Sequence, residues 1–302
     1  MNLAPLAIGA LLSVASLVDD VRTLAARQDF ATAERDVRAY QAQNGATAEF
    51  VVALSWLARG ELAAGRYDQA DAYATEVRRV AGKLEGAQQP DHDPLLATAI
   101  GAAIEVHAHA LVARGGRSQA IEYLRSELAA YAKTSLTERI EKNLNLLGLV
   151  GAAAPALDET HWLGPRPTSL PALRGHPVLL FFWAHWCPDC KAEAPALAHI
   201  ARVFGPKGLV ILGPTRLYGY AAHGDAVTPV EEMRYIDSVR RQFYSDVPDM
   251  AVPVSEANFA TYGASTTPTL VLLDPIGIVR FYHPGAVSGE ELARRIAALP
   301  ER

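Results

Sequence analysis

Apolar residues recur at helical spacing through the first half of the 302-residue chain. Between residues 19 and 150 the sequence is rich in Ala, Arg, Glu and Leu, and it shows almost no alternation of the kind that strands display. Glycines and short polar turns divide this stretch into segments of ordinary helix length. The pattern predicts an all-helical region over residues 19–150, with a long polar loop inside it at residues 82–94.

A short motif recurs within this helical region, at residues 29–33, 65–70 and 116–120. Each copy ends in an alanine, and the first two also carry an aromatic residue. Small and aromatic residues beside a turn let paired helices pack closely, an arrangement similar to tetratricopeptide repeats, whose period is about 34 residues. We expect a tetratricopeptide-like stack of helix pairs, which would offer an extended surface to a protein partner. An unrelated helical bundle is the alternative.

The pattern changes after residue 150. Residues 151–177 are rich in proline, and we interpret them as a linker followed by a short hairpin at residues 155–170. Strand-like and helix-like segments then alternate, and Ser288 opens the last helix as a capping box. Strands are expected at residues 178–183, 209–212, 269–273 and 278–282, and helices at residues 189–204 (interrupted by Pro195), at residues 230–244 and after residue 288. This order predicts a three-layer α/β domain with a mixed sheet over residues 151–302.

The bulk composition narrows the class of protein. Half of the residues are hydrophobic and 20% are charged, which is ordinary for two globular cores. The net charge of −5 and the lack of a long basic run argue against nucleic acid as a main partner. Residues 1–18 are mostly apolar but too short and interrupted for a membrane span, so they fit a signal peptide or a first apolar helix. A signal peptide normally has a Lys or Arg before its apolar run, and this chain has none there.

The two cysteines of the chain, Cys187 and Cys190, form a Cys-x-x-Cys motif between the buried-looking strand at 178–183 and the following helix. A helix N-terminus stabilises a thiolate, which makes the leading sulfur a nucleophile at neutral pH. The second cysteine, one turn on, is placed to attack the mixed disulfide that the first one forms. The motif predicts a pair that exchanges disulfides.

Two other interpretations of the motif fit less well. A zinc site needs further ligands, the chain has no third cysteine, and His185 stands two residues before Cys187, where it is poorly placed to complete a tetrahedron. A peroxiredoxin would need Thr or Ser three residues before the reactive cysteine, where this chain has Ala184. Neither a metal nor another cofactor is expected, because the cysteine pair is itself the redox group.

The stretch from Leu173 to Cys190 resembles the thioredoxin superfamily, and more narrowly the TlpA/ResA group of extracytoplasmic thiol–disulfide oxidoreductases. Thr266, Thr267, Pro268 and the apolar strand after them match the cis-proline loop of that fold. The resemblance covers about residues 155–300. It implies a periplasmic or otherwise extracytoplasmic location, with a cytoplasmic one as the alternative.

The resemblance also assigns roles to residues. It implies that Cys187 is the exposed attacking thiolate and Cys190 the resolving thiol, linked in a redox-active disulfide, and that Pro268 follows a cis peptide bond beside them. Thr267 would offer backbone groups to a substrate chain as a short added strand, and Trp186 would form an apolar lip beside Cys187.

Glu193 follows Cys190 by three residues, the position of a glutamate in ResA-like proteins. On a helix this spacing places the carboxylate on the side of Cys190, where it could accept the proton of that thiol. A solvated surface residue is the alternative. The aromatic segment at residues 213–220 either borders the active-site groove or is an ordinary connecting loop of the family.

Two departures from the family leave the direction of electron flow open. Phe181 stands where many thioredoxins carry a buried Asp, which strengthens the case for Glu193 or a water as proton acceptor. Between the cysteines, Asp189 would raise the pKa of Cys187 and favour a reductant, whereas Pro188 resembles oxidising relatives. We expect reduction of protein disulfides, with an upstream redox partner. The alternatives are an oxidase or isomerase of secreted proteins, or a helical-repeat scaffold whose thioredoxin module is not essential.

Overall fold

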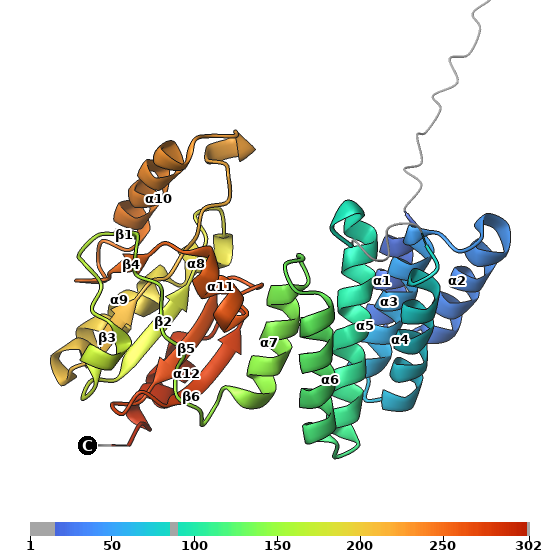
Figure 1. Cartoon of the computed structure of the whole chain (residues 1–302), viewed down its shortest axis with the longest axis horizontal. Coiled ribbons are helices and arrows are strands. Elements are labelled where there is room, and N and C mark those ends of the chain that lie inside the picture. Colours follow the sequence, from blue (N-terminus) through green and yellow to red (C-terminus); the bar gives the residue numbers. More distant parts are fainter. Residues whose placement is uncertain (1–15, 85–89, 301–302) are drawn as a thin grey trace, which may run out of the picture. The chain divides into compact units, whose positions relative to one another are not determined.

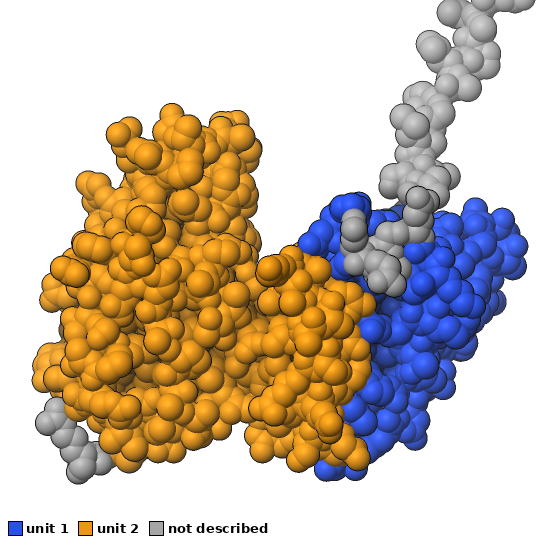
Figure 2. Space-filling view, viewed as in Figure 1, with its two compact units in different colours: residues 1–115 blue, residues 116–302 orange. Residues whose placement is uncertain are grey.

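The computed structural model describes residues 16–84 and 90–300. They divide into two compact units, with the boundary between residues 115 and 116 (Figure 2). The predicted end of the helical domain lies near residue 150, so the last two helices of the predicted array fall within the second unit. Whether residues 19–150 act as one domain stays a prediction.

The described part of the first unit is helical (Figure 1). All but one of its described α-helices begin after a residue whose side chain caps them. The side chain of Asp29 accepts a hydrogen bond from the Thr32 N–H, and Thr47 does the same for Phe50. The helices are α1 (Leu17–Ala26), α2 (Phe30–Asn44), α3 (Ala48–Ala63), α4 (Tyr67–Ala81) and α5 (Pro94–Ala113). The predicted helical N-terminal region is confirmed.

The recurring motif marks the starts of three helices, α2, α4 and α6 (Arg117–Ala130). Its alanines at 33, 70 and 120 are fully buried. Close packing also explains Gly60 on α3, where an added Cβ would lie 2.8 Å from the Ala25 Cβ and 2.9 Å from the Phe30 ring. Small residues at helix contacts are what the repeat interpretation requires, although the tetratricopeptide type itself stays a prediction.

Two segments bear on membrane association. Helix α5 is the one helix of the described residues whose length and composition would allow it to cross a membrane, yet 56% of its most apolar window is buried within the protein, as in a core helix. Of the predicted signal peptide, residues 1–15 lie outside the described residues. Leu17 and Val18 open α1, whose N-cap is Ser16.

A four-stranded sheet of order β3-β2-β5-β6 organises the C-terminal part (Figure 1). Strand β2 (Val178–Phe182) pairs in parallel with β3 (Val210–Leu212) and antiparallel with β5 (Thr269–Leu273), which pairs antiparallel with β6 (Val279–Pro284). All five residues of β2 and of β5 are buried. The predicted mixed sheet is confirmed.

Alternate residues of β2 enter two different cores, because successive side chains of a strand point to opposite faces. Leu179 and Phe181 join the core with α9 (Ala194–Phe204), α10 (Pro229–Phe243) and α12 (Gly289–Ala297). Leu180 and Phe182 join the other core with α11 (Glu256–Tyr262). Helices therefore cover both faces of the sheet, as a three-layer domain requires.

The predicted hairpin at residues 155–170 is wrong. Strand β1 (Trp162–Leu163) pairs instead with β4 (Val252–Pro253), antiparallel, far along the chain. The backbone of Asp158 is also held from that distance, since its N–H donates to the side chain of Asn258 over 2.7 Å. The segment is a long-range tie to the region before α11, which local turn signals could not indicate.

Helix α7 (Thr137–Gly148) follows α6 and contacts α11 at Gly263. The φ of Gly263 is +58°, and a Cβ there would stand 2.2 Å from the Lys142 nitrogen, so only glycine fits. The Asn145 amide donates to the Thr261 carbonyl over 3.3 Å. Helix α7 is thus part of the framework of the second unit.

Candidate active site

The cysteine pair lies at the end of the central strand. After β2 the chain passes through the buried Trp183 and Ala184 to Cys187, which is the N-cap of α8 (Pro188–Ala192). The two cysteines form a disulfide with their Cα atoms 5.3 Å apart, and the Cys190 N–H points to the Cys187 sulfur over 3.1 Å. This backbone donor would also stabilise a thiolate on Cys187 in the reduced protein.

Cys187 is only 2% exposed in this oxidised form. The exposed attacking thiolate belongs to the reduced form and stays a prediction. The chain that covers it includes the cis-proline loop, whose Thr267 carbonyl oxygen lies 3.4 Å from the Cys187 sulfur. The Thr267–Pro268 peptide bond is cis, as the resemblance implied. The Gly285 N–H donates to the Pro268 carbonyl over 2.7 Å and anchors this loop to the end of β6.

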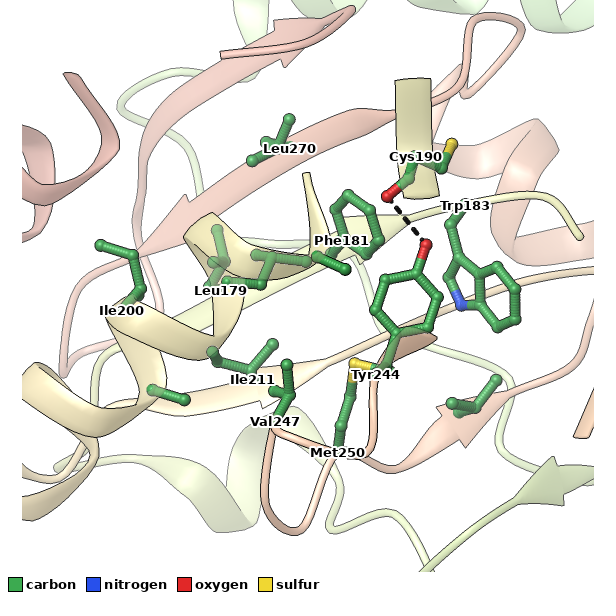
Figure 3. Packing of buried hydrophobic residues seen from close by; sticks show 14 of the residues in the cluster. Leu179, Phe181, Trp183, Cys190, Ile200, Ile211, Tyr244, Val247, Met250 and Leu270 are labelled. Atoms are coloured by element: carbon green, nitrogen blue, oxygen red, sulfur yellow. Dashed lines mark hydrogen bonds between the residues drawn. The ribbon is translucent and has the colours of Figure 1, made fainter. Parts of the chain in front are cut away.

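The helix after the cysteines is divided at Glu193, between α8 and α9. Pro195 has no N–H to continue the ladder, which explains the predicted interruption. The Tyr244 hydroxyl donates to the Cys190 carbonyl over 2.9 Å, and its ring packs edge-on against Phe181 and Trp183 (Figure 3). Tyr244 therefore fixes the backbone of Cys190. Phe181 packs in this aromatic group, at the position where many thioredoxins carry a buried Asp.

Glu193 is buried, with 6% of its surface exposed, so the alternative of a solvated surface residue is wrong. One carboxylate oxygen accepts the Val287 N–H over 2.5 Å, and the other has no hydrogen-bond partner among the described residues. Burial raises the pKa of Glu193, the Asp189 charge adds to the rise, and the Val287 hydrogen bond opposes it. A buried carboxyl group with a raised pKa and a free oxygen is suited to proton transfer.

Trp186 is 45% exposed and meets the segment at residues 216–220. Its ring contacts Tyr218 edge-on at 5.5 Å between centroids. The structure therefore supports the interpretation that residues 213–220 border the active site, and not the alternative of an ordinary connecting loop.

Sequence reasoning missed a buried pair beside this segment. His185 and Glu232 are each 1% exposed, and the His185 Nε2 lies 3.3 Å from a Glu232 carboxylate oxygen. The sequence singles out His185 only through its position two residues before Cys187, as a possible zinc ligand, and it gives no signal for Glu232. Within residues 16–84 and 90–300, no group of three or more His, Cys, Asp and Glu side chains could hold a metal ion.

The comparisons with known proteins agree with this geometry. The model of the AhpC/TSA family matches residues 150–215. The thioredoxin-like protein YneN of Bacillus subtilis is 26% identical over 44% of the chain and 71% of its own length. The thiol:disulfide interchange protein DsbE of Xylella fastidiosa is 26% identical over 41% of the chain, which spans 55% of that relative. The soluble secreted antigen MPT53 of Mycobacterium tuberculosis is 29% identical over 45% of the chain and 71% of its own length.

Solved structures with similar folds include a thiol-disulfide isomerase from Corynebacterium glutamicum, at 22% identity and a TM-score of 0.40, over 49% of this chain and 96% of that one. A secreted Mycobacterium tuberculosis disulfide oxidoreductase is 25% identical with a TM-score of 0.33, over 43% of this chain and 86% of that one.

The C-terminal region has a thioredoxin-like fold with a mixed sheet, and its residues 150–215 match the AhpC/TSA family model. Its sequence relatives include a thioredoxin-like protein and thiol:disulfide interchange proteins named DsbE. The Cys187–Cys190 disulfide is consistent with a redox-active pair of the kind that these names imply.

Proposed function

We propose that this protein reduces disulfides of protein substrates by dithiol–disulfide exchange. The observation that carries the proposal is the placement of Cys187: it caps α8, its sulfur receives the Cys190 N–H, and the Thr267 carbonyl lies 3.4 Å away. A substrate chain laid along Thr267 would be held by backbone hydrogen bonds next to the attacking sulfur. Trp186, half-exposed, would provide the apolar lip.

The exchange proceeds in two steps. The Cys187 thiolate attacks one sulfur of the substrate disulfide, a mixed disulfide forms, and the other substrate sulfur leaves as a thiolate. Cys190 then loses its proton and attacks the Cys187 sulfur, which releases the second substrate thiol. The substrate gains two electrons, the protein retains the Cys187–Cys190 disulfide, and an upstream dithiol must reduce it again.

Trapping tests this mechanism. The variant Cys190→Ala can form the mixed disulfide but cannot resolve it, so substrates should accumulate on Cys187 and be identified by mass spectrometry. The matched control is Cys187→Ala, which keeps one thiol but loses the nucleophile and should trap nothing. Absence of any Cys187-linked species with Cys190→Ala would contradict the exchange mechanism.

Glu193 is proposed as the group that accepts the Cys190 proton in the second step. Its free carboxylate oxygen and raised pKa support this role. We expect Glu193→Gln to slow the resolution of a preformed mixed disulfide by about 100-fold, the lower end of what general acid–base groups contribute. Attack by Cys187 on the first disulfide should be unchanged, and stopped-flow measurement of the two steps separates them. Equal rates of resolution would remove Glu193 from the mechanism.

The competing direction is an oxidase or isomerase, and the reduction potential of the pair decides between them. A value near about −270 mV, as in thioredoxin, supports the reductant, and one near about −120 mV, as in DsbA, supports the oxidant. Asp189 lies exposed in the first turn of α8, where its charge opposes a Cys187 thiolate and favours the reductant.

An extracytoplasmic location is part of the proposal, and a relative named as a secreted antigen supports it. We further propose that the helical region binds a protein partner. If the chain were a scaffold with a non-essential thioredoxin module, replacing both cysteines by serine would leave its function in cells intact.

A further inference from the structure

Two ionisable side chains are buried beside the active site without a place in the exchange steps. His185 precedes Cys187 by two residues, and Glu232 belongs to the first turns of α10. Their closest atoms, His185 Nε2 and Glu232 Oε1, are 3.3 Å apart, and both residues are 1% exposed. Burial of such groups is unfavourable unless they are paired or hydrogen-bonded, so the arrangement needs a physical reason.

The hydrogen bonds of the Glu232 carboxylate come from the backbone of residues 216–220. Its two carboxylate oxygens accept the N–H groups of Tyr218 over 2.5 Å and of Gly219 over 2.8 Å. Hydrogen bonds to a charged acceptor are about twice as strong as neutral ones. The position near the N-terminus of α10 also favours a negative charge. Glu232 therefore anchors the backbone of the segment at Tyr218 and Gly219.

His185 supports the same segment from the side of the cysteines. Burial lowers the pKa of His185, Glu232 opposes this and Lys191 adds to it, so the surroundings favour the neutral imidazole. Neither ring nitrogen has a hydrogen-bond partner among the described residues. Three tyrosines surround the ring edge-on, with centroid distances of 5.5 Å to Tyr218, 5.4 Å to Tyr220 and 5.3 Å to Tyr235. The imidazole thus fills an aromatic cage that α10 and the segment build together.

The segment in turn touches the lip of the site, since Tyr218 contacts both His185 and Trp186. A continuous set of contacts therefore links Glu232, Tyr218 and Trp186, the residue next to Cys187. Trp186 is 45% exposed, and its ring contacts Tyr218 edge-on. The exchange steps themselves do not use His185 or Glu232.

We propose that His185 and Glu232 are positioning residues that fix residues 216–220 against Trp186 and so form the wall that receives the polypeptide substrate. The inference rests on the proposed disulfide reductase function. It assigns the pair to binding of the substrate chain and not to the chemistry of Cys187. A small disulfide without a polypeptide should be insensitive to the pair.

The test compares two substrates in steady-state kinetics: insulin as a polypeptide disulfide and 5,5′-dithiobis(2-nitrobenzoate) as a small one. Glu232→Gln can accept only one of the two backbone N–H groups, so we expect KM for insulin to rise about tenfold, as the loss of one charge-assisted hydrogen bond allows. The kcat for insulin and the rate with the small disulfide should stay within about twofold. The matched control is Glu231→Gln, one residue away, whose side chain bonds Thr228 and not the segment.

Tyr218→Ala removes the wall and leaves the buried pair in place, so it decides the question even if Glu232→Gln does not fold. It should raise KM for insulin to a similar extent, and adding Glu232→Gln to it should cause little further loss, because both act through one contact. His185→Gln keeps a polar side chain beside Glu232 and should bind insulin better than His185→Ala. Unchanged KM in both Tyr218→Ala and Glu232→Gln, or equal losses with both substrates, would overturn the inference. If the unmodified chain reduces neither disulfide, the proposed function fails instead.

Discussion

Glu193 is a carboxyl group whose surroundings favour its protonated form. Because burial raises its pKa above the ordinary 4.5, the folded protein binds the proton more tightly than the unfolded chain does. Its contribution to stability is therefore full below the unfolded pKa and is lost as pH rises through the raised value. Glu193→Gln keeps an acceptor for the Val287 N–H and removes the titration.

We expect the free energy of unfolding of the unmodified protein to fall relative to Glu193→Gln as pH rises from about 4 to about 8. Urea unfolding of the oxidised proteins across this range measures the difference. Glu231→Gln is a control that should stay nearly flat over most of this range. Hydrogen bonds with Thr228 lower the pKa of Glu231, so its stabilising effect is present above the unfolded pKa and is lost only as pH falls through the lowered value. A pH-independent difference for Glu193→Gln would show that the buried carboxyl group does not titrate in this range.

At this scale, local spacing predicted some residues and could not predict others. Cys187 and Cys190 form a short motif that the sequence alone shows. Pro268 and Glu193 were identified through the family resemblance, and the sequence left open whether Glu193 is partly buried or solvated. Glu232 lies on α10 and reaches the site only because the fold returns α10 to it. No spacing along the chain links Glu232 to His185, so the pair could be found only in three dimensions.

Among the elements, those with strong patterns were predicted within a residue or two. Residues 178–183 and 269–273 are continuous apolar runs, and both form strands with every residue buried. The weak elements were missed: β1 and β4 have two residues each and are set by pairing with each other. Pattern reasoning works where burial covers a whole element and fails where a distant partner decides.

The contact between α7 and α11 provides a prediction at this scale. Gly263→Ala places a Cβ 2.2 Å from the Lys142 nitrogen and 2.6 Å from the Glu141 carbonyl carbon, at a φ of +58°. Helix α7 must move, so we expect a loss of about 2–4 kcal/mol in the free energy of unfolding, since overpacking and backbone strain add.

Gly277→Ala is the matched control for this change. Its φ is +78°, but an added Cβ meets only the end of the Arg174 side chain at 3.9 Å. This variant should lose about 1 kcal/mol from backbone strain alone. Urea unfolding of both variants gives the difference that belongs to the α7 contact, and equal losses would show that α7 is not rigidly held there.

On the scale of the whole molecule, the question is whether the thioredoxin-like domain needs residues 116–150 for its stability. Sequence composition places its start near residue 151, whereas the compact unit starts at residue 116. Arg216 explains the difference in physical terms. Its guanidinium, 19% exposed, pairs with Glu138 of α7 and with Glu256 over 2.8 Å, and stacks on the rings of Tyr218 and Phe259.

A chain of residues 151–302 lacks α7 and leaves Arg216 without Glu138, whereas a chain of residues 116–302 keeps both. Removing one partner of a largely buried ion pair costs about 3–5 kcal/mol when nothing replaces it. Arg216 keeps only the more exposed Glu256, and the close contact of α7 with Gly263 is lost as well. We expect the shorter chain to unfold at clearly lower urea concentration, with a loss of at least about 3 kcal/mol. Glu138→Gln in the longer chain isolates the ion pair from the packing of α7. If both chains unfold at the same urea concentration, the thioredoxin-like domain is complete from residue 151, and α7 belongs functionally with the helices before it.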